Sequence, residues 1–331
     1  MFLQSPIFRV WLIAVVALWG AAFLAWNDIA FLAEHWYYPA VMVVGAFVAG
    51  STPEGGGAVA FPALSVFLSI DRVLARDFSL MIQSVGMTSA SIFLLTRRGV
   101  DRSVFLPLLW WVPVAFVGFV VGMFTLQGIR VPVIQALFLS LIMAFALAYW
   151  RSAHRGVDDH CRVRGRRDVV LCVLVLLLGG LCTSLFGTGA DILVYTLLVT
   201  HFTMRENQAT ELSIVLMAAM SLLGFAWRGL VQREVTDFQI RTWLCAAPVA
   251  LLMAPLGAHV LRRMPAEWLL RAVVALNVGQ LAWFNLRQPT LEKMAWSIAF
   301  SLPLLLLFSR ILVHVQRRAE GRALAVVDAT D

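Results

Sequence analysis

Long apolar runs dominate this 331-residue chain and decide the solvent in which it can fold. A helix needs about 20 apolar residues to cross the ~30 Å hydrocarbon core of a bilayer. We find runs of that length at residues 10–26, 78–96, 103–125, 132–150, 208–227, 240–261, 266–285 and 294–314. The sequence therefore predicts an all-α, polytopic membrane protein.

The composition supports lipid as the solvent. Hydrophobic residues make up 61% of the chain and charged residues only 14%, with a mean hydropathy of +0.84. A soluble chain of this composition would expose large apolar patches, so a soluble enzyme and a nucleic-acid-binding domain are both excluded. The run at 10–26 follows a single basic residue, Arg9, and we expect it to be a retained span rather than a cleaved signal peptide.

Two further apolar runs, 39–70 and 169–202, are too long for one span, and each is interrupted near its middle. The first break is Ser51–Gly57 and the second is Thr183–Asp191, about 131 residues further along the chain. After each break the chain has the same order of segments: a short loop, a helix with several polar residues, and two apolar helices. This order indicates an internal repeat. Paired glycine-interrupted segments in two halves of a chain indicate the binding site of a secondary transporter.

The repeat divides the chain into five parts. We expect an N-terminal transmembrane helix and outer loop at 1–38, repeat 1 at 39–151, a cytoplasmic basic linker at 152–168, repeat 2 at 169–286, and a C-terminal transmembrane helix with a cytoplasmic tail at 287–331.

Each interrupted run could be a broken span or a re-entrant hairpin, and the arginine and lysine positions distinguish these two topologies. Two hairpins place 18 basic residues inside and 8 outside, whereas two full spans give 14 and 12. The positive-inside rule therefore favours two hairpins with both termini cytoplasmic. A hairpin plus three spans is an odd number of crossings, so the second repeat is expected to be inverted relative to the first.

Both breaks are rich in glycine and hydroxyl groups. Each is followed by a half-helix, beginning near Gly57 or Gly189, whose N-terminus carries partial positive charge and unpaired N–H groups. Two such ends near the middle of the membrane would bind an anion, although the glycines could instead serve only the bend. The predicted substrate-binding residues are Ser51, Thr52, Glu54, Gly55, Gly56, Gly57, Gln83, Thr183, Ser184, Gly187, Thr188 and Gly189.

Three acids, Glu54, Asp191 and Glu211, fall in or just after the breaks. An ionised acid inside a membrane costs about 2.5–3.5 kcal/mol on insertion scales, so such residues are usually functional. A carboxyl beside an anion site repels the substrate when ionised and tolerates it when protonated, and we assign these three to proton coupling. The alternative is that Glu54 or Asp191 only caps a half-helix.

Other polar and small residues have plainer interpretations. Asn277 and Gln280 favour interhelical hydrogen bonds, and the Gly118/Gly122 pair favours close helix packing. The loop from Arg151 to Asp168 contains histidines and acids without a recurring ligand spacing. We therefore predict no metal, no cofactor and no catalytic residue.

The duplicated glycine motif resembles that of the sulfite exporter TauE/SafE family of bacterial permeases. The resemblance covers roughly residues 37–314 and is carried by Pro53-Glu54-Gly55-Gly56-Gly57 with Pro62-Ala63-Leu64, and by Phe186-Gly187-Thr188-Gly189. It implies transport of sulfite, organosulfonates or similar small anions across the bacterial inner membrane, usually outward. The chain departs from the family pattern at Pro53, Glu54, Thr188, Asp191 and Tyr195.

These inferences together predict a secondary transporter of a small anion, such as sulfite or an organosulfonate, across the bacterial inner membrane with proton linkage. The family resemblance implies that it is an exporter. The alternatives are an anion channel and an integral membrane enzyme acting on lipid-linked substrates. Expected partners are the anionic substrate and the lipid bilayer, with no nucleic acid. A homo-oligomer, the identity of the anion and the direction of transport stay open.

Overall fold

A computed structural model describes residues 5–151, 158–163, 165–261, 263, 266–287 and 289–327. Part of the predicted linker, 152–157 and 164, and the tail residues 328–331 lie outside the described residues. The described chain forms no strand, and its helices in order are α1 (Pro6–Trp26), α2 (Ile29–Glu34), α3 (Tyr37–Ser51), α4 (Gly57–Pro62), η1 (Ala63–Phe67), α5 (Arg72–Leu95), η2 (Arg102–Phe105), α6 (Leu108–Thr125), α7 (Val131–Arg151), α8 (Arg166–Phe186), α9 (Ala190–Thr200), α10 (Glu206–Ala226), η3 (Trp227–Val231), α11 (Asp237–Leu261), α12 (Ala266–Arg287) and α13 (Leu291–Val327).

Among the described residues, eight helices are long and apolar enough to cross a membrane. Seven of them coincide with predicted runs, which confirms an all-helical polytopic membrane protein. The eighth is α8, which forms because no polar residue interrupts 169–182 of the second long run. The remaining predicted span, 266–285, forms α12. The predicted linker also ends earlier than expected, since α8 begins at Arg166.

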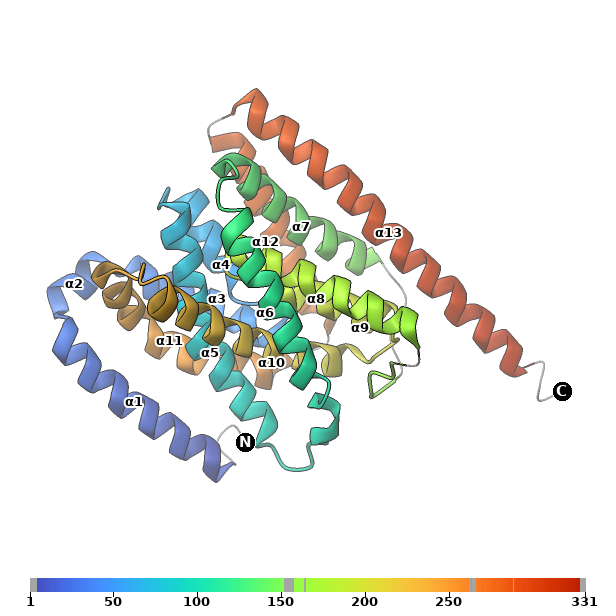
Figure 1. Ribbon diagram of the computed structural model, residues 1–331, viewed down its shortest axis with the longest axis horizontal. Coiled ribbons are helices and arrows are strands. Elements are labelled where there is room, and N and C mark those ends of the chain that lie inside the picture. The colour runs from blue at the N-terminus through green and yellow to red at the C-terminus, as the bar shows by residue number, and fades with distance from the viewer. Residues whose placement is uncertain are drawn as a thin grey trace.

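The helices form one bundle with two peripheral members. Figure 1 shows α1 and α13 at opposite edges of the bundle, with α5 running between the other helices. Few residues of α1 and of the apolar part of α13 are buried, whereas α5 and α7 are largely buried. Exposed apolar helices are expected where the surrounding medium is hydrocarbon.

Two helix pairs pack closely and connect the two halves of the chain. The N-terminal half supplies α3 to a contact with α11, and the C-terminal half supplies α8 to a contact with α6. At the first contact a side-chain carbon at Gly50 would lie 1.8 Å from the carbonyl oxygen of Ala254. At the second, a side-chain carbon at Gly118 would lie 2.3 Å from the carbonyl oxygen of Leu177. The predicted packing role of Gly118 is therefore confirmed, and glycine is required at both crossings.

Both interrupted runs double back on themselves. After α8 ends, α9 returns along it, and Nε2 of His201 lies 2.9 Å from a carboxylate oxygen of Asp168 in the first turn of α8. After α3 ends, the chain returns through α4 and η1, and the ring of Phe78 in α5 lies 4.8 Å from that of Tyr38 at the start of α3. In the second run, the end of α9 therefore lies close to the start of α8.

Glycine conformations explain where the helices stop. Gly187 follows α8 with φ +76°, and its N–H bonds the carbonyl oxygen of Thr183. This left-handed geometry ends a helix and is readily adopted only by glycine. In the first run, α3 ends at Ser51 and α4 begins at Gly57, as the sequence predicted. We call residues 52–56 break 1 and residues 187–189 break 2.

Candidate functional site

The two breaks meet inside the bundle. Gly55 of break 1 has φ +68°, and a side-chain carbon there would lie 2.1 Å from Oδ2 of Asp191 and 2.9 Å from Oγ1 of Thr188. A side-chain carbon at Gly57 would lie 2.5 Å from two carbons of Thr188. Segments about 131 residues apart in sequence are thus in direct contact, as the sequence hypothesis of a shared site requires.

Break 1 buries the carboxyl group of Glu54 against α12. The side-chain amide nitrogen of Asn277 donates to both carboxylate oxygens of Glu54, at 2.8 and 2.9 Å, and also to the carbonyl oxygen of Ile142. Glu54 is 1% exposed. Asn277, to which the sequence assigned only a structural role, is therefore a direct partner of a predicted site residue.

Asp191 follows break 2, in the first turn of α9. One carboxylate oxygen of Asp191 accepts hydrogen bonds from the backbone N–H groups of Gly189 and Ile192, both at 3.0 Å. The hydroxyl of Thr188 donates to the same carboxyl group at 3.3 Å. The N-terminus of α9, predicted as an anion cradle, thus holds the protein's own carboxyl group, which is the capping arrangement weighed above. An external anion can use these N–H groups only if Asp191 moves.

The hydroxyl groups predicted to bind substrate bond to their own helices. Ser51 and Thr52 donate to carbonyl oxygens of α3, and Thr183 and Ser184 donate to carbonyl oxygens of α8. The hydroxyl oxygen of Thr52 also accepts from the N–H of Glu54 at 3.3 Å. In this structure these four side chains shape the helix ends around the breaks.

Gln83 of α5 links the two breaks. Its amide nitrogen donates to the carbonyl oxygen of Gly187 at 2.8 Å and to Ser79 one turn earlier. Its amide oxygen is buried without a hydrogen-bond partner and lies 3.0 Å from the point where a side-chain carbon at Gly55 would stand. A buried acceptor without a partner costs free energy, which is expected where a ligand or a proton supplies the missing bond.

A small cavity opens beside break 1. Its volume is about 50 Å³, which is room for roughly three or four water molecules. Glu54, Glu206 and Thr210 are among its polar walls, and no arginine or lysine is present among the described lining residues. Its walls are Ser51, Thr52, Pro53, Glu54, Phe145, Tyr195, Glu206, Asn207, Thr210, Leu261, Leu270 and Val273.

The sequence hypothesis placed the substrate between both breaks, whereas this cavity is lined by break 1 and by the start of α10. Glu206, Asn207 and Thr210 were missed. The sequence could have indicated these three residues, because they lie in the first turns of the helix that follows the second interrupted run. Glu211, predicted to couple protons, does not line this cavity, and its carboxylate accepts from Arg97 at 3.0 Å.

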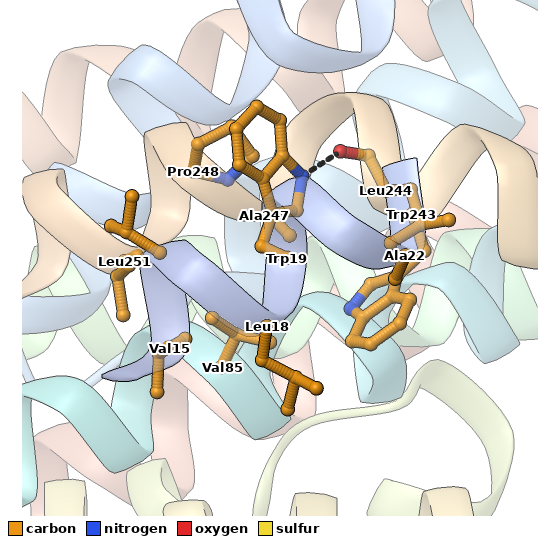
Figure 2. Close-up of a pocket in the computed structure, with 11 residues that line it drawn as sticks. Val15, Leu18, Trp19, Ala22, Val85, Trp243, Leu244, Ala247, Pro248 and Leu251 are labelled. Carbon is orange, nitrogen blue, oxygen red and sulfur yellow. Dashed lines mark hydrogen bonds between the residues drawn. The ribbon is translucent and has the colours of Figure 1, made fainter. Parts of the chain in front are cut away.

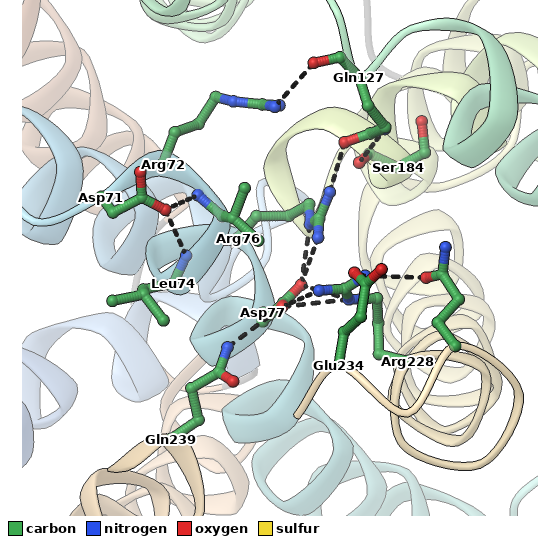
Figure 3. Close-up of polar contacts among 12 residues, drawn as sticks. Asp71, Arg72, Leu74, Arg76, Asp77, Gln127, Ser184, Arg228, Glu234 and Gln239 are labelled. Atoms are coloured by element: carbon green, nitrogen blue, oxygen red, sulfur yellow. Dashed lines mark hydrogen bonds and ion pairs between the residues drawn. The ribbon is translucent and has the colours of Figure 1, made fainter. Parts of the chain in front are cut away.

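A second polar cluster was also missed, because its charges were read only as topology signals. Figure 3 shows Arg76 and Arg228 at the carboxylate of Asp77 near the start of α5, with the side chain of Arg72 extended toward Gln127. Arg76 and Arg228 each approach Asp77 to 2.7 Å, and all three groups are buried. We call Arg72, Arg76 and Arg228 the arginine cluster.

A larger groove lies under α1 but suits a different ligand. It has a volume of about 310 Å³, and Figure 2 shows the apolar side chains that line it between α1 and α11. The indole N–H of Trp19 is already bonded to the carbonyl oxygen of Leu244 at 2.7 Å. This groove fits an acyl chain and offers nothing to a small anion.

Fold and site together define a polytopic helical membrane protein in which two broken helix pairs meet around buried carboxyl groups. The chain belongs to the sulfite exporter TauE/SafE family, since the family model of that description matches residues 37–282, well over half of its length. The match ends within α12, so α13 lies beyond it. No curated protein and no solved structure matches the chain.

Proposed function

We propose that this protein is a secondary transporter that carries a small oxyanion of sulfur, sulfite or an organosulfonate, out of the bacterial cell across the inner membrane. Membership of the sulfite exporter family supports membrane transport of such anions as the general function. The observation that carries the proposal is the contact between break 1 and break 2 beside a cavity of roughly sulfite size. Non-helical backbone inside a membrane is tolerated where it is buried in protein or lines such a cavity.

The two broken helix pairs, α3 with α4 and η1, and α8 with α9, act as re-entrant hairpins of two inverted repeats, 39–151 and 169–286. The return of His201 to Asp168 supports this topology, as does the excess of basic residues on one side. The reciprocal contacts of α3 with α11 and of α8 with α6 support it as well, because a two-fold relation between repeats produces paired interfaces. Both termini are then cytoplasmic.

Transport is linked to protons through Glu54 and Asp191. The cavity beside break 1 carries carboxyl groups and no basic side chain among its described residues, so an anion can enter only when Glu54 is neutral. A proton on Glu54 therefore accompanies the anion into the cavity. Divalent sulfite that leaves with one proton still carries one net negative charge outward, which gains about 2.3 kcal/mol per 100 mV in a cell with an inside-negative potential. A sulfonate that leaves with one proton carries no net charge, and its export follows its concentration gradient; neither case requires a nucleotide.

Proteoliposomes that contain the purified protein test this function. We expect saturable flux of sulfite, isethionate, taurine or sulfoacetate, with counterflow when unlabelled substrate is placed on the opposite side. Flux that neither saturates nor shows counterflow would identify an anion channel. Absence of flux for every anion, with turnover of a lipid-linked substrate instead, would identify a membrane enzyme.

A further inference from the structure

The buried positive charge of the described chain is concentrated in one place. Among the residues that the structure describes, every buried arginine belongs to the arginine cluster, whereas the charged residues that line the cavity beside break 1 are the acids Glu54 and Glu206. A transported anion meets no attractive side-chain charge at break 1. Burying a cation is costly unless it is paired or serves a ligand, so the location of these arginines needs an explanation.

Two of the three arginines are held by Asp77. Its carboxylate accepts from Nε of Arg76 at 2.8 Å, from Nη2 of Arg228 at 2.7 Å and from the amide of Gln239 at 3.1 Å. Arg228 also bonds Gln232 at 2.9 Å and contacts the half-exposed Glu234. These bonds fix the geometry of the cluster but leave three buried guanidinium groups against one buried carboxylate.

Arg72 is the member without a carboxylate contact. Its Nη2 donates to the carbonyl oxygen of Gln127 at 3.2 Å, while its Nη1 is buried with no hydrogen-bond partner, and the residue is 6% exposed. Arg72 also opens the 24-residue helix α5, whose positive end adds to its charge. The helix cap, Asp71, accepts only from the N–H groups of Val73 and Leu74. Figure 3 shows the Arg72 side chain extended toward Gln127, away from Asp71.

The cluster adjoins break 2. A side-chain carbon at Gly187 would lie 2.5 Å from the carbonyl oxygen of Arg76. Gln127 accepts from Arg76 through its amide oxygen and donates through its amide nitrogen to the carbonyl oxygen of Ser184, in the last turn of α8. The groups that surround Arg72 and Arg76 are thus the same groups that support break 2.

We propose that Arg72, supported by Arg76 and Arg228, forms a docking site for the oxyanion next to break 2, separate from the cavity beside break 1. This inference rests on the proposed transport function and adds a second substrate site to it. A guanidinium edge donates two parallel hydrogen bonds and suits sulfite or a sulfonate better than a monoatomic anion. The distribution of basic residues places this site at the outer end of the pathway.

The experiment compares Arg72→Gln with Arg72→Lys and with Arg130→Gln. Arg130 is a matched control, because it lies in the loop that follows Gln127 and is exposed in a salt bridge with Glu292. Sulfite and isethionate are the probes. Flux is measured in proteoliposomes with the anion supplied at the face that carries the cluster, and thermal stabilisation by each anion is measured on the purified protein in detergent.

We expect Arg72→Gln to raise KM about 10- to 100-fold, because the anion loses one charged hydrogen-bond donor, and to change kcat less. Arg72→Lys keeps the positive charge but lacks the paired N–H donors of a guanidinium, so its KM should lie between those of the unaltered protein and Arg72→Gln. The KM of Arg130→Gln should match that of the unaltered protein. The thermal stabilisation by anion should be lost in Arg72→Gln. An unchanged KM together with unchanged stabilisation would overturn the docking site and leave the transport function intact.

A second variant guards against misfolding of the first. Gln127→Glu keeps the acceptor for Arg76 and adds a carboxylate to the arginine cluster, but it loses the amide donor to the carbonyl oxygen of Ser184. It should abolish anion stabilisation because it lowers the net positive charge of the cluster, and its unfolding temperature without anion shows whether the variant is folded. If the unaltered protein transports no anion, the proposed function fails. The stabilisation assay then still decides the site, since equal or absent stabilisation in all variants would refute it.

Discussion

The side-chain amide of Asn277 lies 2.8 and 2.9 Å from the two carboxylate oxygens of Glu54, although the residues are 223 positions apart. This contact joins α12 to break 1 and makes Asn277 the side-chain donor that supports the buried acid. The carbonyl oxygen of Ile142 receives a third bond from the same nitrogen, which fixes the amide orientation. Glu54 is therefore held in place on the cavity wall.

Loss of this amide should destabilise the protein. Asn277→Ala leaves the buried carboxyl of Glu54 without that donor, and we expect a loss of about 1–3 kcal/mol. Asn285→Ala on the same helix is the control, because the amide of Asn285 bonds neutral groups: its nitrogen donates to the carbonyl oxygen of Leu281, and its oxygen accepts from the hydroxyl of Ser297 in α13. Unfolding temperatures in detergent measure both. Equal shifts for the two variants would contradict a special role for the Asn277–Glu54 contact.

Replacement of the acid should change the pH response of transport. Glu54→Gln keeps the shape of the side chain and an acceptor for Asn277 but cannot release a proton. We expect its transport rate to vary little between about pH 5 and pH 8, where the unaltered protein should slow as pH rises and Glu54 ionises. Glu292→Gln is the control, since Glu292 is partly exposed and pairs with Arg130. A pH profile for Glu54→Gln that matches the unaltered protein refutes proton coupling at Glu54.

The sequence predicted the features that depend on local chemistry. Span positions follow from apolar length, and the ends of α3 at Ser51 and of α8 at Phe186 follow from the glycine and hydroxyl content of the two long runs. The contact between the breaks also follows from the repeat. The signals for spans and helix ends are each contained in a stretch of a few to twenty residues, and the repeat is visible by comparing two such stretches, so no knowledge of the folded structure was needed.

The partners of the buried polar groups could not be predicted in this way. Asp191 could face either a ligand or its own helix N-terminus, and only the fold shows that it accepts from Gly189 and Ile192. The contact of Asp77 with Arg228 spans 151 positions. In the sequence both residues are charges near the ends of apolar runs. A place in a solvated loop is there as plausible as a buried ion pair. Tertiary packing of α5 against α10 and α11 decides between these interpretations.

The close approach of the two breaks leads to a prediction at Gly55. Gly55→Ala must adopt φ +68° and place its side-chain carbon 2.1 Å from Oδ2 of Asp191. Gly99→Ala is a matched control, because Gly99 has φ +73° but no atom within 4 Å of the same position. Both variants bear the backbone cost of about 1–2 kcal/mol, and only Gly55→Ala adds an overlap worth about 1–3 kcal/mol. Equal unfolding temperatures for the two variants would show that the breaks do not touch.

The helix crossings lead to a prediction that separates close packing from helix propensity. Side-chain carbons at Gly180 and Gly257 would lie 1.9 Å from the carbonyl oxygen of Ala115 and 2.2 Å from that of Phe47. Backbone atoms cannot rotate away as side chains can, so Gly180→Ala and Gly257→Ala must push whole helices apart. We expect each to cost at least about 1–3 kcal/mol.

Gly279, inside α12, provides the opposite case, because no atom lies within 4 Å of its side-chain position. Gly279→Ala should therefore stabilise the protein by roughly 0.5–1 kcal/mol, through the lower backbone entropy of alanine in the unfolded chain. Thermal unfolding of all three variants in one detergent measures the difference. Stabilisation by Gly180→Ala or Gly257→Ala would show that α6 and α8, or α3 and α11, are further apart than described. The two interfaces that join the halves of the chain would then lack the contact on which the meeting of the breaks depends.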